Sequence, residues 1–328
     1  MFNRRSLLSL ALASPFMASA QSTPGRSAMR WVVPFPAGGA ADVIARNWAS
    51  SYSATSGQTI VVDNRGGASG LIGIQAIKSA PADGSVLGVL NVSFFTALPL
   101  MLSQAPYDPA KDLTPIARLV TSTVVCCVTA ERAKENGWTN FRSLIEWSKK
   151  PGHQLSKGSA GNGSPGHLLI ATVAKRTGAN ILHVPYRGGA PALNDLLSGQ
   201  IDMVFDFMPA LMPHINSGRL IPIAVGSRER SPLMPDVPGM GEFADLGLAD
   251  VDLQSWNALT GPANMSPAVT SAIAQVVARS VTPDLAARLK SSGLVLATTD
   301  GVESTRALIA KDAKFWKEMV QISGAKIE

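Results

Sequence analysis

The sequence predicts an α/β fold of two lobes, each built on its own open sheet, with two strands crossing between them. Short apolar runs alternate with helical runs, which is typical of βαβ units around a parallel sheet. The pattern occurs in two successive blocks, and the 328 residues exceed one ordinary hydrophobic core. Two glycine-rich loops, 34–42 and 158–167, each stand between an apolar run and a helical run, one in each block.

The two blocks are predicted element by element from their apolar periodicity. In the first block we expect strands at 31–35, 59–64 and 85–92, and helices at 41–52, 67–80 and 93–102. In the second block we expect strands at 124–130, 154–159, 181–186 and 201–206, and helices at 141–150, 164–178 and 190–199. Each block has enough strands to form its own open sheet.

The last part of the chain is predicted to return to the first lobe. Between 228 and 262 the chain loses regular periodicity and gains prolines and glycines, which indicates a loop-rich connection rather than a third domain. Pro267 and Pro283 suit the first turns of terminal helices. A strand at 253–261 and helices at 267–281 and 301–324 follow. We therefore expect lobe 1 at 21–120 and 253–328, lobe 2 at 121–252, and a hinge of two crossing strands near 113–120 and 253–261.

Residues 1–20 have the pattern of an export signal that is removed. Arg4 and Arg5 form a basic start, an apolar run follows from Leu7 to Met17, and Ala18-Ser19-Ala20 matches a cleavage site. The apolar run is too short to span a bilayer. The paired arginines also fit twin-arginine export, but a general secretory (Sec) signal explains the same residues and is favoured. The pattern predicts a periplasmic protein.

Charge and motif content exclude several classes of function. The chain carries 29 Lys and Arg against 23 Asp and Glu, and its net charge of +6 falls to +4 without residues 1–20. This mild excess is spread out and does not form the dense basic stripe of a nucleic-acid-binding protein. The four histidines lack a metal-ligand spacing, and no Gly-x-Ser-x-Gly elbow is present. We expect no catalytic residue, metal, cofactor or nucleic-acid partner.

The two cysteines, Cys126 and Cys127, are adjacent in the apolar run 124–130. Neighbouring Cα atoms across a trans peptide are about 3.8 Å apart, which is below the usual disulfide range. We therefore expect a buried strand that carries two reduced thiols.

The first glycine-rich loop offers backbone N–H groups to an anion. Gly38 and Gly39 allow a sharp turn and a close approach to a ligand directly after the first strand. The start of the following helix favours negative charge. Asp42 lies in the first helical turn, where it either caps the helix or shapes the site.

The second loop offers neutral donors beside another helix start. Ser164 is predicted to cap the helix, with Pro165 as its first residue. Ser159 and Asn162 add a hydroxyl and an amide to the free N–H groups. His167 is either a structural histidine or a donor close to the ligand. One such loop in each lobe predicts a receptor for a small carboxylate.

A nucleotide-binding alternative arises from the same loop. Gly161, Gly163 and Gly166 satisfy Gly-x-Gly-x-x-Gly between a strand and a helix, and Arg187 stands about where a 2′-phosphate would need a partner. An NADP-dependent oxidoreductase would use these residues. Pro165 inside the motif, its position in mid-chain and the export signal all argue against this alternative.

At these loops the sequence closely resembles the Bug family, the extracytoplasmic receptors of tripartite tricarboxylate transporters (TctC type). The matching stretches run in order across nearly the whole mature chain: PFPAGGAADVIAR, VVDNRGGASGLIGIQAI, APADGSVLGV, YDPAKDLTPIARL, GSAGNGSPGHL, HVPYRGGAPALNDLLSGQIDMVFD, SGRLIPIAVGSRERSPLMPDVP and WNALTGPANMSP. The resemblance implies a type II periplasmic-binding-protein fold and capture of a mono-, di- or tricarboxylate or an acidic amino acid, without catalysis.

The implied partners are transporter subunits in the membrane, met transiently by a monomeric receptor. A protein that senses the ligand and signals to a membrane sensor is the alternative. The loops and the resemblance together place the ligand site at Phe35, Gly38, Gly39, Ala40, Asp42, Ser93, Ser159, Asn162, Ser164, His167 and Asp206. Four positions carry residues that are not the frequent ones in the family: Ala41, Gly66, Ala160 and Gly189. These departures leave the exact set of ligand contacts open.

Overall fold

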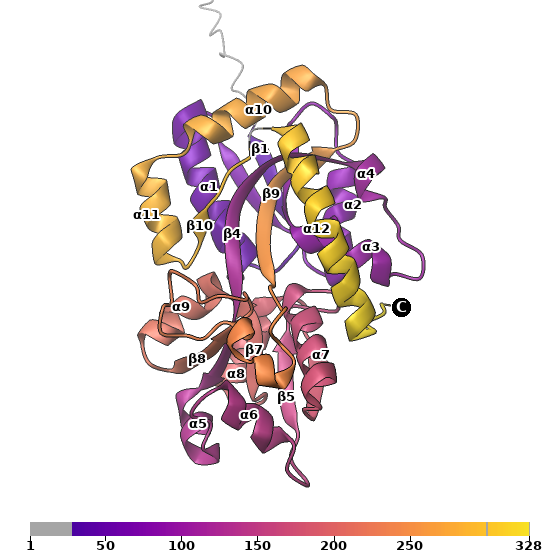
Figure 1. Ribbon diagram of the computed structural model, residues 1–328. Helices are drawn as coiled ribbons and strands as arrows, with labels where there is room; N and C mark the ends of the chain where they lie inside the picture. Colours follow the sequence, from indigo (N-terminus) through magenta and orange to yellow (C-terminus); the bar gives the residue numbers. More distant parts are fainter. Residues whose placement is uncertain (1–27, 300, 328) are drawn as a thin grey trace, which may run out of the picture.

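The computed structural model describes residues 28–299 and 301–327 of the chain. The predicted signal at 1–20 and the start of the mature chain at residue 21 lie outside the described residues. Ten strands form a curled sheet in the order β2-β1-β3-β9-β4-β7-β5-β6, and β8 and β10 also pair with β4. Figure 1 shows this sheet as two stacked halves with helices around each, which confirms the two-lobed α/β fold.

The first half of the sheet is centred on β1 (Met29–Val33), which pairs in parallel with β2 (Ile60–Asn64) and β3 (Val86–Asn91). The helices α1 (Ala40–Ser56) and α2 (Leu71–Lys78) provide the crossover connections. Gly57 ends α1 in a left-handed conformation, with φ of 68°, which is a common helix stop. The shorter elements are η1 (Ala68–Gly70), η2 (Val92–Phe94), α3 (Leu98–Met101) and α4 (Pro109–Asp112).

A single strand, β4 (Leu113–Thr129), runs through both halves. Its first part pairs antiparallel with β9 (Gln254–Pro262), and its second part lies between β7 (Met203–Phe207) and β8 (Leu220–Val225), also antiparallel. The short β10 (Val295–Leu296) pairs with the middle of β4. The predicted strands near 113–120 and 124–130 are therefore one uninterrupted strand.

The second half of the sheet places β5 (Leu155–Ser159) between β6 (Ile181–Pro185) and β7, all parallel. Its helices are α5 (Ala130–Asn136), α6 (Phe141–Ser148), α7 (Pro165–Thr177), α8 (Gly189–Leu197) and α9 (Met208–Asn216). The loop-rich connection predicted from residue 228 contains only the short turns η3 (Met240–Glu242) and η4 (Ala244–Leu246). It leads back to the first half through β9.

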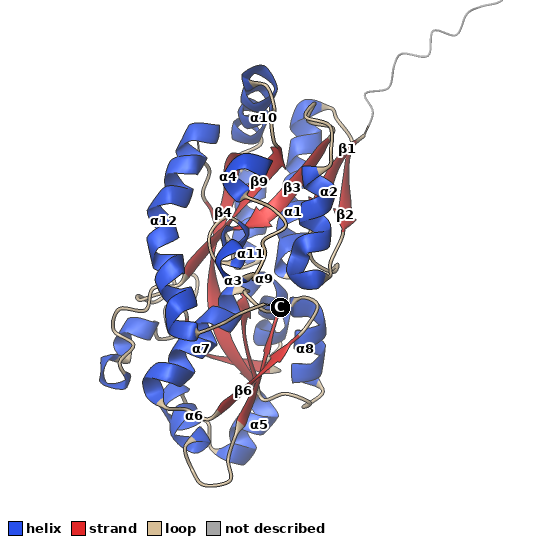
Figure 2. Cartoon of the chain, turned by 90° about the vertical axis from the view of Figure 1, so that its right-hand side faces the viewer, coloured by secondary structure: helices blue, strands red, loops and turns tan. Residues whose placement is uncertain are grey.

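Three terminal helices follow β9: α10 (Pro267–Arg279), α11 (Pro283–Ser291) and α12 (Val302–Ser323). Pro267 and Pro283 occupy first-turn positions, as predicted. Figure 2 shows α12 running alongside the sheet from the first half toward α7 in the second. The helix packs against β4, α3 and α7, and buries Trp316 and Met319. The division into lobes at 120 and 253 stays a prediction, since α12 contacts both halves.

Several observed elements were not predicted, among them β8 and α9, which contain proline, and α5, which contains none. β8 contains Pro222, and α9 contains Pro209 in its first turn and Pro213 in its interior, so neither element was predicted. Pro222 is tolerated because it lies at a register shift in the pairing with β4. Among the described residues, no helix is both long and apolar enough to cross a membrane, and no group of His, Cys, Asp and Glu could hold a metal ion.

The two cysteines lie in β4 and are fully buried with free thiols, which confirms the expected reduced pair. Their side chains join different clusters because successive residues of a strand point to opposite faces. Cys126 packs in the large core with Phe205, whereas Cys127 packs in the cluster formed by α8 and α9. Burial raises the pKa of both thiols, so the reactive thiolate is disfavoured.

We predict that both thiols resist alkylation in the native protein and react only after unfolding. Mass spectrometry of protein treated with iodoacetamide should find no adduct on the native chain and two on the unfolded chain. Cys127→Ala should cost about 1 kcal/mol of stability through lost packing. A mass two hydrogens lower than that of the reduced chain, with no adducts after unfolding, would contradict this prediction.

Candidate functional site

The first predicted ligand loop joins β1 to α1 and is held by Asp42. Gly38 takes a left-handed φ of 83°, and its N–H donates a 2.9 Å hydrogen bond to Asp42 Oδ2. The same oxygen accepts from Arg46 Nε at 3.0 Å. Asp42 is buried and folds back onto the loop that precedes it. Ala40 and Ala41 begin α1 and line the cleft, while the Asp42 and Val43 N–H groups both donate to Gly39 O, at 3.0 and 3.1 Å.

The second predicted loop joins β5 to α7 and is held by two histidines. Ser164 caps α7 by accepting from the His167 N–H at 3.4 Å, which confirms the predicted helix start. Gly163 donates its N–H to His167 Nδ1 at 3.0 Å. The rings of His167 and His183 stack with centroids 4.0 Å apart, and His183 Nε2 lies 2.6 Å from Ser159 Oγ. Ser159 and His167 therefore brace the loop from behind.

The cleft between the two loops consists of three small hollows that share Phe35 and Ala160. Their volumes are about 40, 10 and 160 Å³. All three are smaller than the several hundred cubic ångströms of a typical small-molecule pocket. The halves of the molecule touch across the cleft, since a Cβ added at Gly188 would lie 2.5 Å from Pro36 Cδ. The structure therefore represents a closed cleft.

Four helices begin at the hollow of about 40 Å³, which we call the central hollow. Gly39 and Ser164, the N-cap residues of α1 and α7, line it from opposite halves of the molecule. Gly189 at the start of α8 and Phe207 before α9 line it as well. Helix N-termini carry partial positive charge and unpaired N–H groups, so their convergence favours an anion.

Polar side chains complete the central hollow. Asn91 ends β3 and donates to Ser255 Oγ at 2.7 Å, while Asn257 lies opposite it in the β3–β9 ladder. Asp206 is the next-to-last residue of β7 and accepts the Phe207 N–H at 2.8 Å. Burial raises the pKa of Asp206 to about 6, although the Phe207 N–H and nearby Lys157 oppose that rise. The hollow therefore combines neutral amides with one carboxyl group that titrates close to neutral pH.

The structure brings most of the predicted residues to the cleft and places others behind it. The predicted residues that line one of the three hollows are Phe35, Gly39, Ala40, Ser93, Asn162, Ser164 and Asp206. Those that brace the loops without lining a hollow are Gly38, Asp42, Ser159 and His167. Their part in ligand binding stays a prediction.

Sequence reasoning missed Asn91 and Asn257, and it noted Gly189 only as a departure from a residue frequent in the family. Asn257 is 2% exposed in a strand whose residues 255–262 are all buried, so an amide within a buried run was the available signal. A glycine is required at position 189 for a steric reason, because a Cβ there would lie 2.1 Å from Asp206 Oδ2. Arg187 lines the hollow of about 160 Å³ and not the central one.

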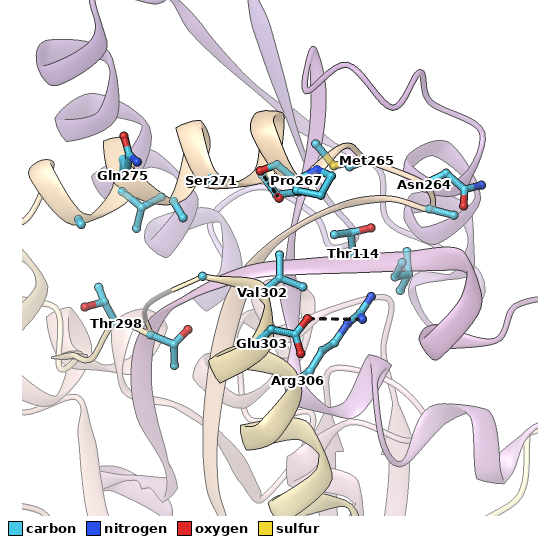
Figure 3. Close-up of a pocket in the computed structure, with 18 of the residues that line it drawn as sticks. Thr114, Asn264, Met265, Pro267, Ser271, Gln275, Thr298, Val302, Glu303 and Arg306 are labelled. Atoms are coloured by element: carbon cyan, nitrogen blue, oxygen red, sulfur yellow. Dashed lines mark hydrogen bonds and ion pairs between the residues drawn. The ribbon is translucent and has the colours of Figure 1, made fainter.

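A larger depression of about 770 Å³ lies away from the two loops, between α10 and the start of α12 (Figure 3). Ser266 already caps α10, and the acidic Glu303 occupies the first turn of α12, where it pairs with Arg306 at 3.8 Å. Ser164 caps α7 in the same way, so capping does not distinguish the two places. The cleft between the loops is the better candidate site because helix starts from both halves of the molecule line it.

Comparison with known proteins gives the family. A model of the tripartite tricarboxylate transporter family receptor (TctC) matches residues 44–325. The chain belongs to this family. It is 33% identical over 323 residues to the protein BugT of Bordetella pertussis, covering 97% of this chain and 94% of BugT.

Two solved structures agree with this chain in fold. The periplasmic binding protein BugD superposes with a TM-score of 0.84 at 30% identity, covering 92% of this chain and 98% of BugD. A Rhodopseudomonas palustris protein solved with adipate also gives 0.84, at 27% identity over 91% of this chain and 98% of the other. The chain is thus a TctC-family solute-binding protein. Family and neighbours are binding proteins and not enzymes, which removes the oxidoreductase alternative.

We predict that Gly39→Val blocks the cleft while the protein still folds. A Cβ at Gly39 meets only Pro36 O, at 3.6 Å, so the branched side chain has the cleft as its free space. Calorimetry with a carboxylate that the wild type binds should show a loss of roughly 100-fold, about 3 kcal/mol. Ser164→Ala should lose about 1–2 kcal/mol. The exposed control Ala54→Val should bind as the wild type does; equal losses in all three would contradict steric blocking.

We predict that Asp42 stabilises the folded protein at neutral pH. Burial alone would raise its pKa, but hydrogen bonds from Arg46, the Gly38 N–H and Asn64 outweigh burial and lower it. A depressed carboxyl pKa stabilises the native state above the unfolded value near 4, and this contribution disappears as the carboxylate is protonated.

Asp42→Asn should therefore unfold at lower urea concentration than the wild type at pH 7, with the difference shrinking as the pH falls below about 4. The exposed variant Asp236→Asn serves as the control and should show no comparable loss. A difference between Asp42→Asn and wild type that stays constant from pH 7 to pH 3.5 would contradict the charge-based explanation.

Proposed function

We propose that the protein is a periplasmic receptor that closes around a small carboxylate and presents it to the membrane subunits of a tripartite tricarboxylate transporter. The observation that carries the proposal is the convergence of α1 and α7, whose N-termini face one hollow from opposite halves of the molecule. Two helix starts on opposite walls suit a ligand with a carboxylate at one or both ends.

The chemistry of the central hollow supports a carboxylate held by neutral donors. No lysine or arginine lines this hollow among the described residues; its polar side chains are those of Asn91, Ser164, Asp206 and Asn257. Backbone and amide N–H groups bind a carboxylate through charge-assisted hydrogen bonds. The adipate held by the R. palustris relative supports a dicarboxylate of similar size as the first compound to test.

Opening and closing of the cleft would admit the ligand. β4 continues unbroken from one half to the other, and β10 pairs with it at Val120 and Thr121. Bending near this point separates the loops without breaking either half-sheet, as in other hinged binding proteins. The hollows that meet at Phe35 and Ala160 would then merge into one entrance.

The location and the partner follow from the same proposal. The signal-like residues 1–20 support Sec export to the periplasm, and the family supports delivery to a transporter by a monomeric receptor. A receptor that passes its signal to a membrane sensor would need the same closed, liganded form. The genes that adjoin this one distinguish the two partners.

A panel of linear dicarboxylates from C4 to C8, monocarboxylates and acidic amino acids tests the proposal. At least one should bind with a Kd in the micromolar range or tighter by calorimetry, and raise the unfolding midpoint. Small-angle scattering should show a smaller radius of gyration with that compound than without it, because the free form spends time open. Absence of binding across the panel, while NADP binds, would overturn the proposal.

A further inference from the structure

A lysine is buried directly behind the second ligand loop. Lys157 lies in β5, is 0% exposed, and its Nζ has no hydrogen-bond partner among the described residues. A buried ammonium group without a partner costs several kcal/mol unless another charge compensates it. The residues around Lys157 therefore have to explain why the chain keeps a cation at this position.

The ammonium group is separated from the cleft by one residue of backbone. Gly166, in the first turn of α7, lines the central hollow, and a Cβ added there would lie 3.3 Å from Lys157 Nζ. The same Cβ would lie 2.0 Å from Phe205 O, so only glycine fits between β7 and the hollow. Gly166 thus lets the cation approach the wall of the cleft from behind.

The permanent surroundings of Lys157 compensate its charge only in part. Burial lowers the pKa of Lys157 to about 7, and the N-terminal end of α7 carries partial positive charge that also disfavours a cation. Asp206 and Cys126 oppose the shift, while His167 and His183 lie close enough for Lys157 to lower their pKa values. An anion in the central hollow would supply the missing negative charge.

We propose that Lys157 is a specificity-determining residue of this receptor, whose ammonium group attracts the carboxylate that a ligand places at the N-terminus of α7. The inference rests on the proposed function, and it identifies the protein charge by which the receptor favours an anionic ligand. Lys157 acts across the Gly166 backbone and does not touch the ligand. Coulomb attraction over this short separation in a closed cleft corresponds to roughly a ten- to hundredfold gain in affinity.

A buried charge that is kept for ligand binding has opposite effects on the stability of the ligand-free protein and on ligand affinity. Without ligand, Lys157→Met removes a buried cation that Asp206 compensates only in part, and should raise the unfolding midpoint. With ligand, the same variant should weaken binding because the anion loses its counter-charge. A residue that only supports the loop would change both quantities in the same direction when it is replaced.

The experiment compares the wild type with Lys157→Met and Lys157→Gln, and with Lys150→Met as the exposed control. Calorimetry uses the dicarboxylate from the C4–C8 series that binds the wild type most tightly, and the neutral diamide of the same length. For both Lys157 variants we expect at least tenfold weaker binding of the dicarboxylate, an unchanged Kd for the diamide, and a higher unfolding midpoint without ligand. Lys150→Met should change none of the three.

The outcomes separate this inference from the proposed function. If no carboxylate binds the wild type, both are overturned. If the dicarboxylate binds wild type and Lys157→Met equally, or if both Lys157 variants lose stability together with affinity, only the inference is overturned. Where the diamide binds too weakly to measure, the direction of the stability change decides between a charge and a structural support.

Discussion

The two halves of the sheet share one strand, and the geometry of the cleft depends on that continuity. β4 pairs antiparallel with β9 in one half and with β7 in the other. This arrangement turns the carboxyl ends of the parallel strands in both halves toward the same gap (Figure 1). Helices that follow those strands then begin at the gap, as they do at the ligand crevices of open α/β sheets. These helix N-termini add partial positive charge from the backbone to the cleft.

The sequence predicted those parts of the site that are built from residues consecutive in the chain. A strand, a glycine pair and a helix start are local features, so Gly39, Ala40 and Ser164 could be placed without knowledge of the fold. Asn257 could not, because it comes from a distant strand, and only the β3–β9 pairing brings it beside Asn91. The prolines of β8 and α9 argued locally against regular structure, and for β8 the tertiary pairing with β4 overrode this.

The glycines of the second loop show why a motif alone left two functions open. Gly161 and Gly163 take φ values of 128° and 78°, which only glycine adopts readily. Gly166 instead avoids a collision with Phe205 O. The same spacing therefore arises from two turns and one close packing contact, with no phosphate involved. The histidine behind the loop holds the turn through the Gly163 N–H, so Gly163 and His167 form one structural unit.

The charges of the closed cleft limit where a ligand can carry its own charge. Asp206 lies at the wall of the central hollow, and its Oδ2 is held against Gly189 at the start of α8. A second carboxylate beside Asp206 would be repelled strongly because the low dielectric of a closed site weakens charge screening. The starts of α1 and α7 lie elsewhere on the wall and have no acidic side chain aimed at the hollow among the residues that line it. The placement of charge within the ligand, more than its total charge, therefore decides which carboxylate fits. The buried Lys157 favours a carboxylate at the start of α7, whereas Asp206 disfavours one beside itself.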